Sequence, residues 1–102
     1  MNDAVSVKVI FSPVFRTIFH CRERGIILAK KDASIHSLLS QLSDDSGGKI
    51  DKLVFENERE AISAGLMIQV NDRTYTGNAL NQRTVSLRDQ DVVSLLYFIS
   101  GG

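Results

Sequence analysis

RDQDVVSLLYFISGG, residues 88–102, is the stretch that decides the expected fold of this chain. Its first four residues predict a tight turn, and Val92 to Ile99 form an apolar run rich in residues that favour β-strands. A terminal strand that pairs within a sheet would hold the chain end in a fixed place. The glycines after Ser100 lack a Cβ, so they would form a slender tail that can enter narrow sites. The stretch therefore predicts a strand that presents the carboxylate of Gly102 to another protein, with an inert flexible end or a tag remnant as the alternative.

Composition predicts one globular domain, residues 1–102, whose tail is residues 100–102. Of the 102 residues, 43% are hydrophobic and 24% are charged, which is ordinary for a chain with a real core. The formal net charge is zero, which argues against nucleic acid as a partner because phosphate contacts need a basic surface. The start of the chain resembles no signal peptide, and no apolar run approaches the roughly 20 residues that span a membrane. A single cysteine cannot form an internal disulfide, which fits a reducing compartment. Together these features lead us to expect a cytoplasmic protein without membrane partners.

The first third of the chain predicts a hairpin with a long connection. Val5 to Phe11 alternate apolar and polar residues, the period of a half-buried strand, and Pro13 ends that strand. We expect residues 15–19 to form a loop or short turn. A second strand is expected over residues 26–30.

One helix is expected over residues 35–44. Ser34 is a good N-cap because its hydroxyl can accept from free N–H groups of the first helical turn. The next apolar residues recur at helical spacing and make one stripe, which can cover one face of a sheet. Glycines 47 and 48 predict the end of the helix, and the stripe consists of Ile35, Leu38, Leu39 and Leu42.

The second half of the chain predicts the remaining strands. Residues 49–65 leave two alternatives open: Ile50, Leu53 and Val54 could form one helical turn, or residues 52–55 a short strand. Residues 56–60 are expected to form a charged loop. A third strand is expected over residues 66–70, followed by a turn at Asn71-Asp72. Residues 77–83 are expected to be a loop, and residues 85–87 a short strand that leads into the final turn. The order predicts an α+β fold of the ubiquitin-like β-grasp type, with a mixed four- to five-stranded sheet and one main helix packed on one face.

The segments LMIQVNDRTYTG, residues 66–77, and TVSLRDQDVVSLLYFISGG, residues 84–102, resemble the end of the β-grasp sulfur carriers. That superfamily includes the small subunit of molybdopterin synthase, the thiamine sulfur carrier and the ubiquitin-related modifier. VKVIFSPVFR, residues 7–16, and the helix capped by Ser34 are similar to the molybdopterin synthase small subunit. Two departures are present: Tyr97-Phe98 replaces the usual Pro-Pro before the tail, and Gln90 replaces the turn glycine.

The resemblance implies a carrier rather than an enzyme, possibly the non-catalytic small subunit of a complex, with no permanently bound cofactor or metal. It implies that an E1-like adenylyltransferase, using ATP, activates Gly102 at the end of a tail that includes Ser100 and Gly101. A free carboxylate is ionised at neutral pH and is a poor electrophile, so it needs such activation. Sulfur would then replace the adenylate, and the thiocarboxylate would pass sulfur to an acceptor such as the molybdopterin synthase large subunit. The alternatives are a modifier joined through Gly102 to other proteins, a carrier for thiamine or tRNA thiolation, and an interaction domain with an inert terminus.

Strand alternation also predicts a docking surface. If Val93 and Leu95 face the helix, then Val92, Leu96 and Phe98 lie on the open face of the sheet. An apolar patch beside a reactive tail is a candidate for partner docking. The alternative is that this face packs against a second copy or a long loop.

Three other features have ordinary structural explanations. His20-Cys21 has no third ligand at a recognisable spacing, so a buried free thiol is expected. His36 is expected at the surface. Gly47-Gly48 lacks the Lys-Ser/Thr of a phosphate-binding loop, so it is expected only to end the helix.

Overall fold

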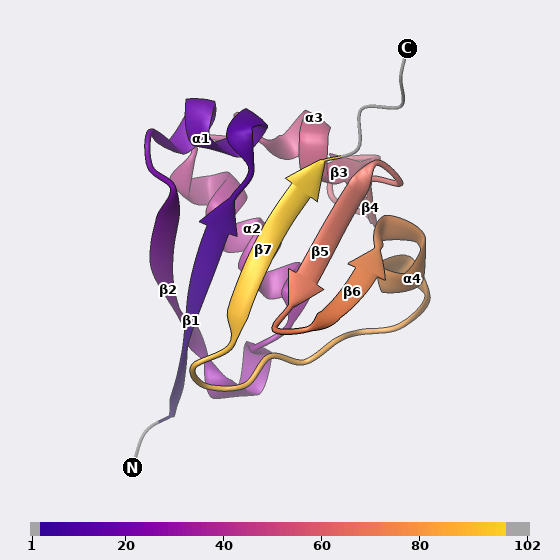
Figure 1. Cartoon of the computed structure of the whole chain (residues 1–102). Coiled ribbons are helices and arrows are strands. Elements are labelled where there is room, and N and C mark those ends of the chain that lie inside the picture. The colour runs from indigo at the N-terminus through magenta and orange to yellow at the C-terminus, as the bar shows by residue number, and fades with distance from the viewer. Residues whose placement is uncertain (1–2, 98–102) are drawn as a thin grey trace.

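The computed structural model describes residues 3–97 and contains one large sheet with helices on one side (Figure 1). The sheet has five strands in the order β2-β1-β7-β5-β6. Its strands are β1 (Ala4–Phe11), β2 (Glu23–Ala29), β5 (Leu66–Val70), β6 (Arg73–Thr76) and β7 (Val92–Tyr97). The helical segments are α1 (Pro13–Phe19), η1 (Lys30–Asp32), α2 (Ile35–Asp45), α3 (Asp51–Val54) and α4 (Gly77–Gln82). A separate small sheet pairs β3 (Phe55–Glu56) with β4 (Ala61–Ile62).

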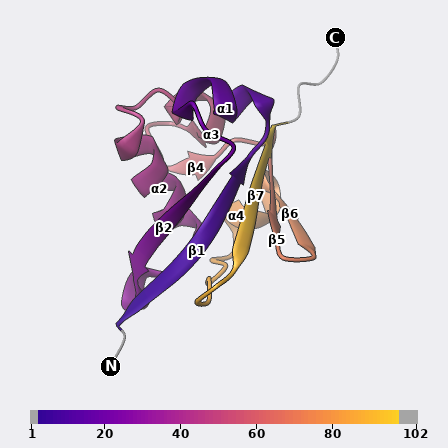
Figure 2. The ribbon, with the colours of Figure 1, turned by 60° about the vertical axis from the view of Figure 1, so that its left-hand side comes forward.

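The strand β7 lies in the middle of the large sheet. It runs parallel to β1 and antiparallel to β5, while β1 and β2 form an antiparallel hairpin. The sheet is therefore mixed, with the main helix α2 packed against one face (Figure 2). This arrangement confirms the predicted α+β, β-grasp architecture.

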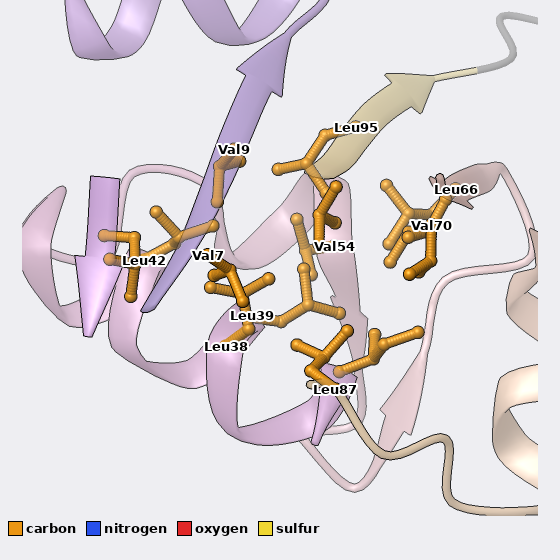
Figure 3. Close-up of a cluster of buried hydrophobic side chains, with 14 of the residues drawn as sticks. Val7, Val9, Leu38, Leu39, Leu42, Val54, Leu66, Val70, Leu87 and Leu95 are labelled. Atoms are coloured by element: carbon orange, nitrogen blue, oxygen red, sulfur yellow. The ribbon is translucent and has the colours of Figure 1, made fainter. Parts of the chain in front are cut away.

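Helix α2 follows the sequence prediction closely. The Ser34 hydroxyl accepts from the amide of Ser37 at 3.1 Å, which caps the first turn. The helix ends where Gly47 and Gly48 adopt positive φ angles of 70° and 82°, a conformation that glycine takes without strain. Its leucines point toward Val7, Val9 and Leu95 of the sheet (Figure 3). The predicted apolar stripe is fully buried: Ile35, Leu38, Leu39 and Leu42.

The loop predicted for residues 15–19 is wrong, because this segment belongs to helix α1. Pro13 stands at the first position of the helix, where its missing N–H needs no partner. Phe15 and Phe19 lie four residues apart on the buried face, and the ring of Phe19 stacks on Phe11 at 4.5 Å. The proline that ends β1 therefore also begins a helix that closes one end of the core.

The loop predicted for residues 77–83 is also wrong, because helix α4 forms there. The Thr76 hydroxyl accepts from the amide of Ala79 at 3.2 Å and caps the helix. Leu80 of α4 is buried in the core. Strand β6 was not predicted. The short strand expected at residues 85–87 is reduced to a single bridge between Ser86 and Ser34.

Residues 49–65 combine the two alternatives that the sequence left open. One helical turn, α3, is followed directly by the short strand β3. The second strand of the large sheet begins three residues earlier than predicted, at Glu23, and ends at Ala29. In the part of the chain from residue 3 to residue 97, the helices are too short or too polar to span a membrane.

Candidate functional site

The turn Arg88–Asp91 fixes the start of β7. The Asp91 carboxylate accepts from the backbone amide of Arg88 at 2.8 Å, and Asp89 accepts from the amide of Ser6 at 2.7 Å. Gln90 has a φ of 72°, and its amide donates to the carbonyl of Ser6 at 2.6 Å. The predicted tight turn is thus bonded to β1 as well as to itself.

Asn71 connects the β5–β6 turn to the same end of β7. Its side-chain amide donates to the Asp91 carboxylate and accepts from the amide of Val92, each at 3.0 Å. Its backbone amide donates to the carbonyl of Val92 at 2.8 Å. The sequence predicted a turn at Asn71 but not this connection, because nothing in the local pattern places the residue beside Asp91. Together these bonds fix the register of β7 in the sheet.

The side chains of β7 alternate between the core and the open face. Val93 and Leu95 are fully buried, while Leu96 is 37% exposed and Val92 is half-buried. Phe98, Ser100, Gly101 and Gly102, which the sequence assigns to the docking surface and the tail, lie outside the described residues. The alternation places Leu96 where the sequence expected it; its role in docking stays a prediction.

Strand register brings two further apolar side chains near Leu96 on the open face. Met67 on β5 is directly opposite Leu96, and Ile10 on β1 is opposite Ser94, the preceding open-face residue of β7. Ile10 is 36% exposed and Met67 is half-buried. We call Ile10, Met67 and Leu96 the tail-proximal patch. Sequence alternation alone could have assigned each to an outward position, but only the strand order places them together.

Val92 lies at the other end of β7, away from the tail-proximal patch. It is paired in register with Lys8 of β1, whose ammonium lies 3.3 Å from the Glu23 carboxylate. The structure therefore divides the predicted docking surface into an apolar end near Leu96 and a polar end near Val92.

Arg59 forms the densest charged cluster of the described chain, away from β7. Its guanidinium lies 3.0 Å from Asp44 and 3.4 Å from Asp51, and donates to the fully buried Ser43 hydroxyl at 3.0 Å. The hydrogen bond to Asp44 is the main cause that raises the pKa of Arg59. The guanidinium also lies over the ring of Phe55, 5.8 Å from its centre. The cluster fastens the loop between β3 and β4 to α2 and α3.

The remaining sequence candidates are not part of β7. Cys21 is a half-buried free thiol packed against the core, and His20 is exposed with a φ of 59° at the end of α1. His36 is half-buried rather than fully exposed, and its Nδ1 is buried without a hydrogen-bond partner. Residues 3–97 contain no group of three or more potential metal ligands.

Comparisons with known proteins give matches at the level of structure. No protein-family model and no curated protein matches the sequence. The HVO 2177 protein of Haloferax volcanii has a TM-score of 0.78 at 19% identity, covering 100% of this chain and 91% of the other. A Pyrococcus furiosus protein assigned as molybdopterin converting factor subunit 1 has a TM-score of 0.68 at 25% identity; the match covers 93% of this chain and 99% of the other. The small archaeal modifier protein 1 of Methanosarcina acetivorans has a TM-score of 0.73 at 17% identity; the match covers 99% of this chain and 100% of the other. The chain therefore has a ubiquitin-like β-grasp fold, which it shares with these solved structures.

Proposed function

We propose that this chain is a sulfur carrier that works through the carboxyl group of Gly102. In this proposal an E1-like adenylyltransferase joins that carboxylate to the α-phosphorus of ATP and releases pyrophosphate. A sulfur nucleophile then displaces AMP from the acyl-adenylate and leaves a thiocarboxylate. The carrier performs no catalysis itself and delivers the sulfur to an acceptor enzyme in the cytoplasm.

The observation that carries the proposal is the position of β7. The strand is hydrogen-bonded on both sides, by β1 and β5, and its first residue is clamped by Asn71. Its last described residue, Tyr97, directly follows Leu96 of the tail-proximal patch. A strand that is paired on both sides and whose last described residues lie beside an apolar patch supports the presentation of residues 98–102 to a partner.

Molybdopterin biosynthesis is the pathway that we propose. The likeness to the Pyrococcus furiosus converting-factor subunit, at 25% identity over 93% of the chain, favours it. The acceptor would then be a molybdopterin synthase large subunit. Thiamine and tRNA thiolation are the alternative pathways.

Conjugation to proteins is the second candidate function. The likeness to the small archaeal modifier protein favours it, because a modifier needs the same activated carboxyl group. The two functions differ in the final nucleophile: sulfur for a carrier, and a lysine amine of a target protein for a modifier.

Partner docking is proposed for Val92, Leu96 and Phe98, with Ile10 and Met67 added from the register of the sheet. Such a patch would bury apolar area against the adenylyltransferase and guide the tail into its ATP site. Phe98→Asp is expected to weaken binding to that enzyme while the far-ultraviolet circular dichroism spectrum stays unchanged. Unfolding of the variant would instead place Phe98 in the core.

Intact mass spectrometry tests the carrier chemistry. The protein is incubated with a cognate adenylyltransferase, ATP and a sulfide donor, and the expected product has one oxygen replaced by sulfur. A variant that lacks Gly101 and Gly102 is the matched control and should keep its mass. An unchanged mass for the full chain, when the same enzyme converts a known carrier, contradicts the proposal. Gly-Gly remnants on lysines of other proteins would favour the modifier instead.

A further inference from the structure

A polar cavity of about 340 Å³ lies beside the start of β7. One wall comes from the β5–β6 turn and β6, within residues 70–75, and the other from the segment that leads into β7, within residues 85–91. Figure 1 shows this turn next to the chain that enters β7, at the end of the sheet opposite α1 and α3. The cavity is at the lower end of the size range of small-molecule pockets, about 300–1,000 Å³.

Hydrogen bonds hold both walls of the cavity in place. The side chain of Asn71 joins the β5–β6 turn to the carboxylate of Asp91 at 3.0 Å. On the other wall, backbone bonds of 3.0 and 2.8 Å join Val85 and Leu87 to residues 35 and 33 at the start of α2. The backbone of Ser86, between these two residues, is therefore turned away from α2. The cavity is a built part of the fold rather than a gap between loose loops.

The lining supplies hydrogen-bond donors that other residues leave free. Arg73 and Arg88 come from the two different walls, and neither guanidinium forms an ion pair within 4 Å in the chain from residue 3 to residue 97. The hydroxyl groups of Ser86 and Tyr75 add two further donors, and the ring of Tyr75 packs against the core. The donors thus reach the cavity from more than one direction.

Two carboxylates, Asp72 and Asp91, also line the cavity and balance the charge of the two arginines. Both oxygens of Asp91 are already engaged, because one accepts from the side chain of Asn71 at 3.0 Å and the other from the backbone amide of Arg88 at 2.8 Å. Asp72 is exposed in the β5–β6 turn, and it pairs with neither arginine within the described residues. Asp72 is therefore the carboxylate of the lining that would compete with a bound anion.

We propose that this cavity binds the phosphate group of a small phosphate monoester. Such a group carries a charge of about −1.5 to −2 at neutral pH and presents three strong acceptor oxygens. Donors from two walls suit a tetrahedral group, whereas a planar carboxylate can be satisfied by the fork of one arginine. The ring of Tyr75 and the side chains of Val70 and Val85 would contact the organic part of the ligand. The cavity lies at the opposite end of β7 from Tyr97, so the inference does not depend on chemistry at the chain end.

Titration of the ¹⁵N-labelled full chain with phenyl phosphate tests the proposal, with sodium chloride at matched ionic strength as the reference. The amide signals of Arg73, Ser86 and Arg88 should shift and saturate. Benzoate has the same ring with a carboxylate and should bind at least about fivefold more weakly. Equal binding of benzoate, shifts that do not saturate, or shifts centred on Lys30 and Lys31 would overturn the proposal.

Inorganic phosphate separates the two possible sources of the phosphate group. It should shift the same amide signals as phenyl phosphate but bind several-fold more weakly, because it makes no contact with the apolar part of the lining. Binding as tight as that of phenyl phosphate would overturn the assignment of the cavity to an organic ester.

Three variants of exposed arginines test the two walls. Arg73→Gln and Arg88→Gln should each weaken phenyl phosphate at least about fivefold. Arg83→Gln is the matched control, because it removes the same charge from an exposed residue outside the lining. Its affinity should change less than about twofold, since solvent screens that charge. A loss with Arg83→Gln as large as that with Arg73→Gln would show a general attraction of charge and overturn the proposal.

Asp72→Asn provides a test of opposite sign. It removes the competing carboxylate, so it should strengthen the binding of phenyl phosphate several-fold; unchanged or weaker binding would contradict the proposed site. If an arginine variant does not fold, this variant and the benzoate comparison decide. A chain that lacks Gly101 and Gly102 should bind phenyl phosphate with unchanged affinity, which separates this site from the carrier function. Loss of binding in that chain would overturn the assignment to this cavity.

Discussion

Gln90→Gly should stabilise the protein, although the replaced residue is an exposed glutamine in a turn. Gln90 holds a φ of 72° at the start of β7, in the left-handed region that L-residues other than glycine occupy at a cost. Its backbone amide donates to the Ser6 carbonyl at 2.6 Å, a bond that glycine keeps. The side chain contributes one long contact to Asp89, at 3.4 Å in an exposed position. The substitution therefore removes strain and little else.

The expected gain follows from two opposing terms. Relief of the left-handed conformation is worth about 1–2 kcal/mol, and the greater freedom of glycine in the unfolded chain costs about 0.5–1 kcal/mol. The net effect is a gain of about 0.5–1 kcal/mol in the free energy of unfolding. For a domain of this size that gain raises the Tm by about 2–8 °C.

Urea denaturation followed by circular dichroism measures this difference, with two control variants. Gln90→Ala loses the same side-chain contact but keeps the strained backbone, so it should not be stabilised. Gln69→Gly places glycine in the middle of β5 and should lose about 0.5–1 kcal/mol. A Gln90→Gly protein that is less stable than the unmodified chain, while Gln69→Gly behaves as expected, would refute the inference that this turn is strained.

Three further substitutions test other parts of the structure. Leu96→Asp should weaken binding to the adenylyltransferase about tenfold in a titration. The Tm should stay within a few degrees, because the side chain is 37% exposed. Unchanged affinity would exclude the tail-proximal patch from docking. Gly77→Ala should lower the free energy of unfolding, measured in urea, by about 3 kcal/mol, because the added Cβ would lie 1.9 Å from the backbone carbonyl oxygen of Ser63. Gly25→Ala is the control and should have little effect, because its Cβ would meet no atom within 4 Å. Similar stability of the two variants would contradict the close approach at Gly77. Arg59→Ala should lower the Tm and accelerate amide hydrogen exchange over residues 55–62, because it leaves the buried Ser43 hydroxyl without its hydrogen-bond donor. Unchanged exchange in these residues would show that other contacts hold the loop between β3 and β4.

The long, periodic elements could be predicted from the sequence because their signals are local. The alternation of β1 and the apolar stripe of α2 each repeat often enough to identify a strand and a helix. The cap at Ser34 and the glycines after Ser46 mark the ends of α2. The alternation of β7 likewise assigns Leu95 to the core and Leu96 to the open face.

The short helices could not be recognised by periodicity. Helix α1 has seven residues and α4 has six, so each contributes about one apolar repeat, which a loop can also contain. Their caps were the available signals: Pro13 at the first position of α1, and Thr76 before α4. Each element depends on tertiary packing, through Phe15 and Leu80, more than on its own sequence.

The composition of the candidate site depends on strand order, which the sequence does not reveal. Ile10 and Met67 are separated by more than fifty residues, and they come near Leu96 only because β7 lies between β1 and β5. The link from Asn71 to Asp91 has the same origin. Gly77 is constrained by a backbone segment far from it in the chain, so nothing adjacent to it in sequence marks it as irreplaceable.

The central position of β7 also has a mechanical consequence. A pull on the chain beyond Tyr97 acts along the strand, so it loads the hydrogen bonds to β1 and to β5 in shear, all at the same time. Peeling a strand from a sheet edge breaks such bonds one after another and needs less force. An unfolding machine that captured this end of the chain would therefore meet the most resistant part of the molecule first.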